Sequence, residues 1–156
     1  MLSIKRVGLS DLLLCGLTNG QLVMFKVSRA GLEMKAREQA HDFGVNCLAV
    51  KVVEGRVVAV TGGDDQHIRV GVYSAEGSLI AFTRKFAHTS CIKGIALYKK
   101  NGVLTVASSG YDQRLKFWEV SFDDQTVKIQ KKCQVRHCLS DMNGLCKSGS
   151  KLILVG

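Results

Sequence analysis

The sequence predicts an all-β protein built from repeated units of about four strands each. Similar segments recur 47 residues apart, namely TGGDDQHIRVG at 61–71 and SSGYDQRLKFW at 108–118. The apolar runs between these segments are short and rich in β-branched residues, which is typical of strands and not of long helices. Together, the repeat and the short runs favour a repeat architecture made of sheets.

The period holds at several positions in the chain. His41 and His88 are 47 residues apart, and so are Asp65 and Asp112. A weaker copy, CGLTNGQLVMF, occupies 15–25, and a fourth copy begins in MNGLCKSGSKLILVG at 142–156. We therefore expect units over residues 1–37, 41–85 and 88–132, with the start of another at 137–156.

Each unit is expected to contain the same strands in the same order. Short apolar runs at 57–60, 103–106 and 152–155 predict central strands that are buried on both faces. Segments 68–72 and 115–120 predict the next strands, each after a tight polar turn. Alternating residues then predict solvent-facing outer strands, where interspersed lysines discourage edge pairing; they are Leu32, Met34 and Ala36 in one unit and Val127 and Ile129 in another.

The segment GLEMKAREQA at 31–40 is compatible with two structures. It is rich in helix formers, so a helix is one alternative. Its counterparts in the other units alternate between apolar and polar residues, which favours a strand. We expect a strand here.

Composition limits the class of protein. The chain has 22 Lys and Arg against 13 Asp and Glu, and its net charge of +9 suits acidic partners such as RNA, although a solvated basic surface is equally compatible. The early apolar run at 12–15 is too short for a signal peptide or a membrane span, so we expect a cytoplasmic protein with no membrane partner.

The cysteines are expected to be reduced, and most of them buried. No recognised zinc-ligand spacing links Cys133, His137, Cys138 and Cys146. No Gly-rich strand–turn–helix for a nucleotide or S-adenosylmethionine is present either. We therefore expect no metal and no cofactor.

The unit that opens at His88 and ends in Trp118-Glu119 resembles a repeat of the WD-repeat β-propeller family. The resemblance implies propeller blades, about three plus the start of a fourth. Propellers close with about four to eight blades. A partial propeller is therefore expected, which is part of a longer protein, a truncated product or a subunit completed by another chain. The end after Gly156, where the next turn should start, favours the truncated product.

The resemblance implies a structural role for residues that could otherwise suggest a hydrolase. Ser, His and Asp are the elements of an acyl-transfer triad, but a hydrolase gains nothing from a copy in each repeat. In this family the same positions form a buried hydrogen-bonded network, which here comprises His88, Ser108, Asp112, Trp118, His41, Thr61 and Asp65. No catalytic residue is expected.

Two groups of residues are candidates for contacts with RNA or a protein partner. The turns carry Asp-Gln where blades usually carry Asp-Gly, and this predicts either a tolerant turn or a contact surface formed by Gln66, His67, Gln113 and Arg114. The stretch KIQKKCQVRH contains no acid, and its cations could meet phosphates or face solvent; they are Lys128, Lys131, Lys132 and Arg136.

Within the family, residues 41–156 are most similar to regulators that partner a cytoplasmic 2′-O-ribose methyltransferase of the tRNA wobble nucleotide. The strings that carry this similarity are HDFGVNCLAV, YDQRLKFWEV and CQVRHCLSDMNGL. The resemblance implies a non-catalytic subunit that binds tRNA and the methyltransferase. A generic protein-interaction scaffold remains an alternative, and a ubiquitin-ligase substrate receptor is less favoured because 118–121 read Trp-Glu-Val-Ser and not W-D-x-R.

Overall fold

The computed structural model describes residues 3–7, 11–138, 144–149 and 151–155. These residues form antiparallel sheets with short connections, and no helix occurs among them. The prediction of an all-β fold made of four-stranded units is confirmed, and the sheets are consistent with propeller blades. Within the described ranges, no segment forms a helix long and apolar enough to cross a membrane.

Each four-stranded sheet is formed by consecutive strands in chain order. Blade 1 contains β1 (Ser3–Arg6), β2 (Leu12–Gly16), β3 (Gln21–Ser28) and β4 (Gly31–Gln39). Blade 2 contains β5 (Val45–Val53), β6 (Arg56–Gly63), β7 (His67–Tyr73) and β8 (Leu79–Phe86). Blade 3 contains β9 (Ile92–Lys100), β10 (Val103–Gly110), β11 (Arg114–Phe122) and β12 (Val127–Arg136). The hairpin of β13 (Gly144–Ser148) and β14 (Lys151–Val155) follows.

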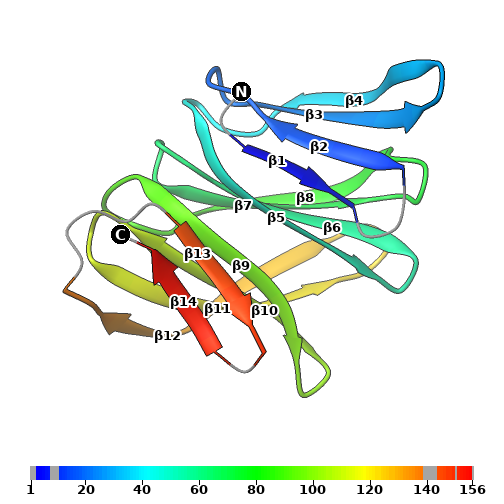
Figure 1. Cartoon of the computed structure of the whole chain (residues 1–156). Helices are drawn as coiled ribbons and strands as arrows, with labels where there is room; N and C mark the ends of the chain where they lie inside the picture. The colour runs from blue at the N-terminus through cyan, green and yellow to red at the C-terminus, as the bar shows by residue number, and fades with distance from the viewer. Residues whose placement is uncertain (1–2, 8–10, 139–143, 150, 156) are drawn as a thin grey trace.

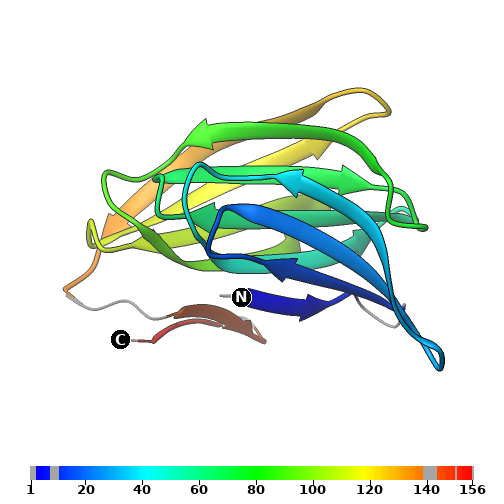
Figure 2. The same ribbon diagram turned by 90° about the horizontal axis from the view of Figure 1, so that it is seen from above.

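The sheets follow one another with their first strands innermost (Figure 1). Strand β1 contacts β5, β5 contacts β9, and β9 contacts β13. The view from above shows the sheets as successive layers (Figure 2). Blade 2 therefore lies between blades 1 and 3, and blade 3 lies between blade 2 and the β13–β14 hairpin.

The apolar core is divided among the interfaces between blades. Leu22 and Met24 of blade 1 pack with Tyr73 of blade 2. Val70 of blade 2 packs with Trp118 of blade 3 in a second cluster. A third, smaller cluster joins blade 3 to the β13–β14 hairpin. Because blades 2 and 3 have a neighbouring sheet on each face, their central strands consist largely of apolar residues, as expected for such sheets.

The segment at 31–39 is strand β4, so the helical alternative is wrong there. Its backbone pairs with β3 from Gln21↔Gln39 to Ser28↔Gly31, with a bulge beside Met24 and Phe25. The pairing supplies hydrogen-bond partners along the whole segment, and this tertiary context outweighs the modest helix propensity of its residues.

The expectation that most cysteines are buried is wrong. All six are free thiols within the described residues, and only Cys15 and Cys47 are buried. Cys91 is half-buried, whereas the exposed thiols lie on β12, just after it, and on β13. These exposed cysteines occupy outer or edge positions that no following sheet covers; they are Cys133, Cys138 and Cys146.

The turn before the third strand of each blade places one residue in the left-handed region. This residue is Gly20 with φ 82°, Gln66 with φ 68° and Gln113 with φ 56° in blades 1, 2 and 3. The amide of Gln66 donates to the carbonyl of Gly63, and the amide of Gln113 donates to that of Gly110. Glycine adopts this conformation without strain, whereas glutamine does not.

We expect Gln113→Gly to raise the free energy of unfolding by about 0.5–1 kcal/mol. Removing the strain of a left-handed L-residue gains about 1–2 kcal/mol, and the greater freedom of glycine in the unfolded chain offsets part of it. Urea denaturation followed by circular dichroism measures the difference. Gln125→Gly, at a turn position without positive φ, should give no gain; an equal gain there would contradict the explanation.

Candidate functional site

Blade 3 contains a continuous chain of buried hydrogen bonds. Nδ1 of His88 lies 2.8 Å from Oδ1 of Asp112, and its Nε2 lies 2.8 Å from Oγ of Ser108. The indole Nε1 of Trp118 donates to the same Oγ at 2.9 Å. The loop, the second strand and the third strand of the blade are thus joined through side chains that are 24, 20 and 10 residues apart in sequence.

Blade 2 contains the same arrangement without the tryptophan. Nδ1 of His41 lies 2.9 Å from Oδ1 of Asp65, and its Nε2 lies 2.8 Å from Oγ1 of Thr61. The other carboxylate oxygen of Asp65 accepts from the backbone amide of Asp42 and from Arg84, both at 3.0 Å. The carboxylate therefore ties the loop before the blade to the turn and to the outer strand.

The hydrogen-bond roles in this network follow from what each group can donate. An ionised carboxylate only accepts and an indole N–H only donates. His88 therefore donates from Nδ1 to Asp112, and the Ser108 hydroxyl donates to Nε2 while accepting from Trp118. His41, His88 and Ser108 are fully buried, so no substrate reaches the hydroxyl. This arrangement suits a structural role, since satisfied buried networks fix a single packing.

Burial and hydrogen bonding shift the pKa values of the network in the directions that keep this arrangement. Burial lowers the pKa of His88 below its ordinary value, although the contact with Asp112 opposes that effect. Burial alone would raise the pKa of Asp65, but the hydrogen bond and charge interaction with His41 and the two backbone amides lower it to about 2. A neutral His88 and an ionised Asp65 are therefore the folded forms near neutral pH.

We expect stability to fall in two steps as the pH is lowered. The unfolded chain binds a proton at His88 near pH 6.5, above the lowered pKa of the folded state, so the stability that this group contributes at neutral pH is lost as pH falls through that value. The stability that the Asp65 carboxylate contributes is likewise lost as the pH falls from 3.8, the ordinary pKa of the group, to about 2, its pKa in the folded protein. Urea denaturation at a series of pH values measures both steps, and Asp65→Asn should reduce the second, to which other carboxyl groups with lowered pKa values such as Asp112 also contribute; an unaltered profile would contradict this assignment.

In blade 2 the position equivalent to Trp118 is Gly71, and other residues fill the space. A Cβ at Gly71 would lie 2.9 Å from Nη1 of Arg69 and 2.9 Å from the Tyr73 hydroxyl. Arg69 is buried, and its Nη2 lies 2.5 Å from Oε2 of Glu38 in blade 1. The Tyr73 hydroxyl also donates to Glu38, and the Arg69 guanidinium lies 4.7 Å from the centroid of the Phe82 ring.

The sequence analysis missed this cluster. No motif links Glu38 to residues 31 and 35 positions later. A signal was nonetheless present, because an arginine interrupts the apolar strand HIRVGVY two residues before a glycine that replaces an aromatic residue. An arginine there needs a buried partner.

The candidate contact residues of the turns are half-buried. The carbonyl of Gln66 accepts from the amides of Ala87 and His88, and the carbonyl of Gln113 accepts from that of His137. The imidazole of His67 packs edge-on against Phe86 with 5.6 Å between ring centroids. Arg114 stands directly opposite Arg136 in the β11–β12 ladder.

The basic residues of β12 are all exposed, but they differ in their contacts. Nζ of Lys132 lies 2.8 Å from Oε2 of Glu119, and Nζ of Lys131 donates to Gln134 at 3.1 Å. Among the residues that the structure describes, Lys128 and Arg136 have no acidic side chain within ion-pair distance. Lys132 is the extra residue of a bulge in the β11–β12 ladder, and its side chain does not share the sheet face that carries Lys131.

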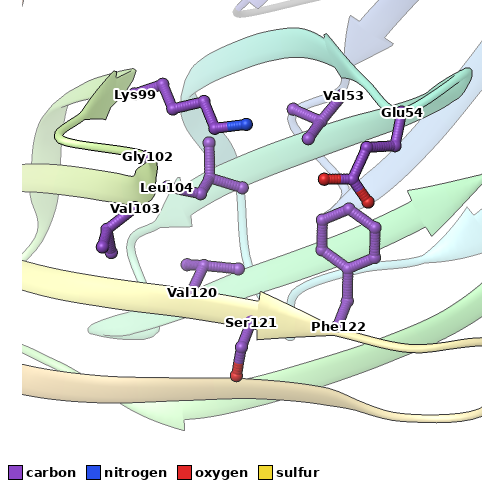
Figure 3. Close-up of a pocket in the computed structure, with 9 residues that line it drawn as sticks. All are labelled: Val53, Glu54, Lys99, Gly102, Val103, Leu104, Val120, Ser121 and Phe122. Carbon is purple, nitrogen blue, oxygen red and sulfur yellow. The ribbon is translucent and has the colours of Figure 1, made fainter.

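Two further features lie outside the hydrogen-bonded networks, namely a cavity between blades 2 and 3 and a set of exposed aromatic side chains. At the end with the β5–β6 and β9–β10 turns, a shallow cavity of about 290 Å³ has Leu104, Val120 and Phe122 in its wall, with Glu54 beside them (Figure 3). Phe43, in the connection between β4 and β5, is 64% exposed, and Tyr111, in the turn between β10 and β11, is 41% exposed. The Lys93 ammonium lies 5.4 Å from the Tyr111 ring centroid.

The comparisons with known proteins agree with this architecture. A family model described as WD domain, G-beta repeat, matches residues 34–70 and 80–119. The matched stretches are WD repeats, and they support placing the chain in the WD-repeat family. Proteins of that class typically act as non-catalytic scaffolds for interactions with other proteins. No curated protein matches the chain.

Proposed function

We propose that the chain is a non-catalytic subunit that binds other macromolecules through the surfaces of its blades. The observation that carries this proposal is the closure of the repeated His-Asp-hydroxyl networks, whose histidines are fully buried with both ring nitrogens bonded. A hydrolase would need one such constellation open to substrate. In this proposal the function depends on side chains exposed at the surface of the blades and not on the buried networks.

The finer proposal is that the partners are tRNA and a 2′-O-ribose methyltransferase in the cytoplasm. The strings quoted above resemble the C-terminal blades of WD repeat-containing protein 6, which regulates methylation of the wobble ribose. The net charge of +9 and the exposed cations of β12 support a contact with RNA. In this proposal the methyltransferase carries the methyl-donor site and the blades position the tRNA.

The exposed aromatic residues offer a surface for the protein partner. Phe43 and Tyr111 lie at the turn edge of neighbouring blades, and exposed aromatics are enriched in protein interfaces. A scaffold for other complexes is the second candidate, because WD repeats serve many partners. A ubiquitin-ligase receptor is the third.

Two experiments test the proposal. Mapping ribose 2′-O-methylation over tRNA anticodon loops, in source cells with and without the gene, should show loss confined to the wobble ribose of a few tRNAs. Affinity capture with the wild-type chain should recover a methyltransferase, and Phe43→Ala/Tyr111→Ala should recover less. An unchanged methylation map, or recovery of a ligase adaptor in its place, would reject the methylation role.

A further inference from the structure

A buried cation lies between blades at the same position of two successive interfaces. Arg69 stands opposite Thr61 in the β6–β7 ladder, and Lys116 stands opposite Ser108 in the β10–β11 ladder. Thr61 and Ser108 both contact the histidine that opens their blade. Arg69 and Lys116 are therefore equivalent, and both are buried and point toward the preceding blade.

The residue that faces this cation has opposite charge in the two interfaces. In blade 1, Glu38 stands opposite Leu22 and pairs with Arg69. The equivalent residue of blade 2 stands opposite Ile68, and it is Lys85. Leu22 and Ile68 both pack into the interface with the next blade, so Glu38 and Lys85 project the same way. At the second interface, a lysine takes the place of the carboxylate.

Further cations surround this position, and acids do not balance them. Arg114 and Arg136 are directly opposite and share the face of Lys116, and so does Lys131, opposite Trp118. Nearby charges of Lys131 and Arg114 add to burial in lowering the pKa of Lys116. We define the basic patch as Lys85, Arg114, Lys131 and Arg136, with Lys116 beneath them.

The ion pairs within the described residues leave the basic patch with uncompensated charge. Lys116 is 3.7 Å from Oδ2 of Asp112, but that carboxylate already accepts from Nδ1 of His88 and from the backbone amides of Thr89 and Arg114. Lys116 donates to the Ala87 carbonyl at 2.5 Å. In the described part of the chain, no acidic side chain pairs with Lys85, Arg114, Lys131 or Arg136. Like charges placed directly opposite on a sheet are destabilising.

The other blades show that this position does not require cations. The pair equivalent to Arg114 and Arg136 is Gln21 and Gln39 in blade 1 and His67 and Phe86 in blade 2. Gln21 accepts hydrogen bonds from Arg37, and His67 packs on Phe86. Those pairs are satisfied within the chain, whereas among the described residues no acidic side chain pairs with either arginine of the third pair.

We propose that the basic patch binds phosphate groups of an RNA backbone. Two guanidinium groups on one face of a sheet match the several acceptor oxygens of a phosphate, while a carboxylate is satisfied by one bidentate arginine. Residues on one face of a strand recur about every 6.6–6.8 Å, so Arg136 and Lys131, which have Gln134 between them on that face of β12, offer two contacts about two such steps apart. The proposal rests on the proposed function for its choice of RNA, and an acidic protein segment is the competing occupant.

Fluorescence anisotropy with a labelled, unmodified tRNA transcript tests the proposal over a series of KCl concentrations. Lys85→Glu and Arg114→Gln/Arg136→Gln each lower the net charge by two, the first by replacing a positive charge with a negative one and the second by removing two positive charges. Lys100→Glu on β9, an exposed lysine outside the patch, removes the same charge and serves as control. We expect the patch variants to bind on the order of tenfold more weakly, with the salt slope of the double variant reduced by roughly 1.5, and the control to remain near wild type.

Thermal unfolding of Lys85→Glu provides an independent test. A carboxylate at 85 should pair with Lys116 as Glu38 pairs with Arg69, and raise Tm by roughly 2–4 °C while RNA binding falls. Weaker binding with a higher Tm cannot result from misfolding. A lower Tm would reject the equivalence of the two interfaces.

The outcomes separate this proposal from the proposed function. Equal binding by the patch variants and Lys100→Glu would overturn the RNA patch even if the methylation map changes with the gene. Patch-dependent tRNA binding with an unchanged map would support the patch and reject the methylation role. Patch-dependent binding of labelled poly-glutamate that is tighter than that of tRNA would overturn the choice of RNA in favour of an acidic protein segment.

Discussion

Trp118→Ala is expected to lower the free energy of unfolding by about 3–5 kcal/mol, the usual cost of removing a buried tryptophan side chain. The indole is 2% exposed and packs between blades 2 and 3. Its loss leaves a cavity in that core and removes the donor to Ser108. Because Trp118 is the single tryptophan of the sequence, urea denaturation must be followed by far-ultraviolet circular dichroism.

Two further variants separate packing from hydrogen bonding at this position. Trp118→Phe keeps most of the ring and loses the N–H donor, so it should cost less than Trp118→Ala. Leu32→Ala, at a side chain that is 61% exposed, should change stability by no more than about 0.5 kcal/mol. A Trp118→Ala cost as small as that of Leu32→Ala would show that the blade 2–blade 3 core does not depend on the indole.

Arg69→Met is expected to cost about 3 kcal/mol or more, the lower bound usual when one partner of a buried ion pair is removed. The variant leaves Glu38 and the Tyr73 hydroxyl without the guanidinium in an interface where the Arg69 side chain is 2% exposed. The apolar stem of methionine keeps much of the packing, so the loss reports mainly the unpaired carboxylate. Urea denaturation measures it.

A double-mutant cycle with Glu38→Gln isolates the pair itself. We expect the combined variant to lose less than the sum of the single variants, with a coupling energy of about 1–3 kcal/mol. Arg56→Met is the matched control, since Arg56 pairs with Asp124, whose side chain is 83% exposed, and such pairs contribute about 0–1 kcal/mol. Additive losses at Arg69 and Glu38 would rule out a direct interaction.

The repeat period carried most of the information about the fold. Spacing alone aligned His41 with His88 and Asp65 with Asp112, and alternation located the outer strands. Local propensity was misleading at 31–39, where backbone pairing to β3 decides the structure. The bulges beside Lys35 and Lys132 could not be predicted, because they depend on how the sheet twists and not on a residue type.

The candidate site was predictable where its residues repeat and not where they differ between repeats. The grouping of His88, Ser108 and Asp112 follows from the period, and the structure places them within hydrogen-bond distance. The opposite charges of Glu38 and Lys85 at equivalent positions could be recognised only from the strand register, because each residue acts through the side chain that faces it on the next sheet. The exposed thiols were missed because composition does not show which positions of a sheet its neighbours leave uncovered.

The sharing of each core between two sheets constrains how the sequence can diverge. A residue on the outer strand of one blade faces a residue 31 positions later on the next blade. The two side chains have opposite charges at 38 and 69 and like charges at 85 and 116. Divergence at one member of such a pair should therefore be followed by change at the other, so homologous chains are expected to show covariation at this separation. A homologue with an acid at the position of Lys85 should also have lost the arginine pair.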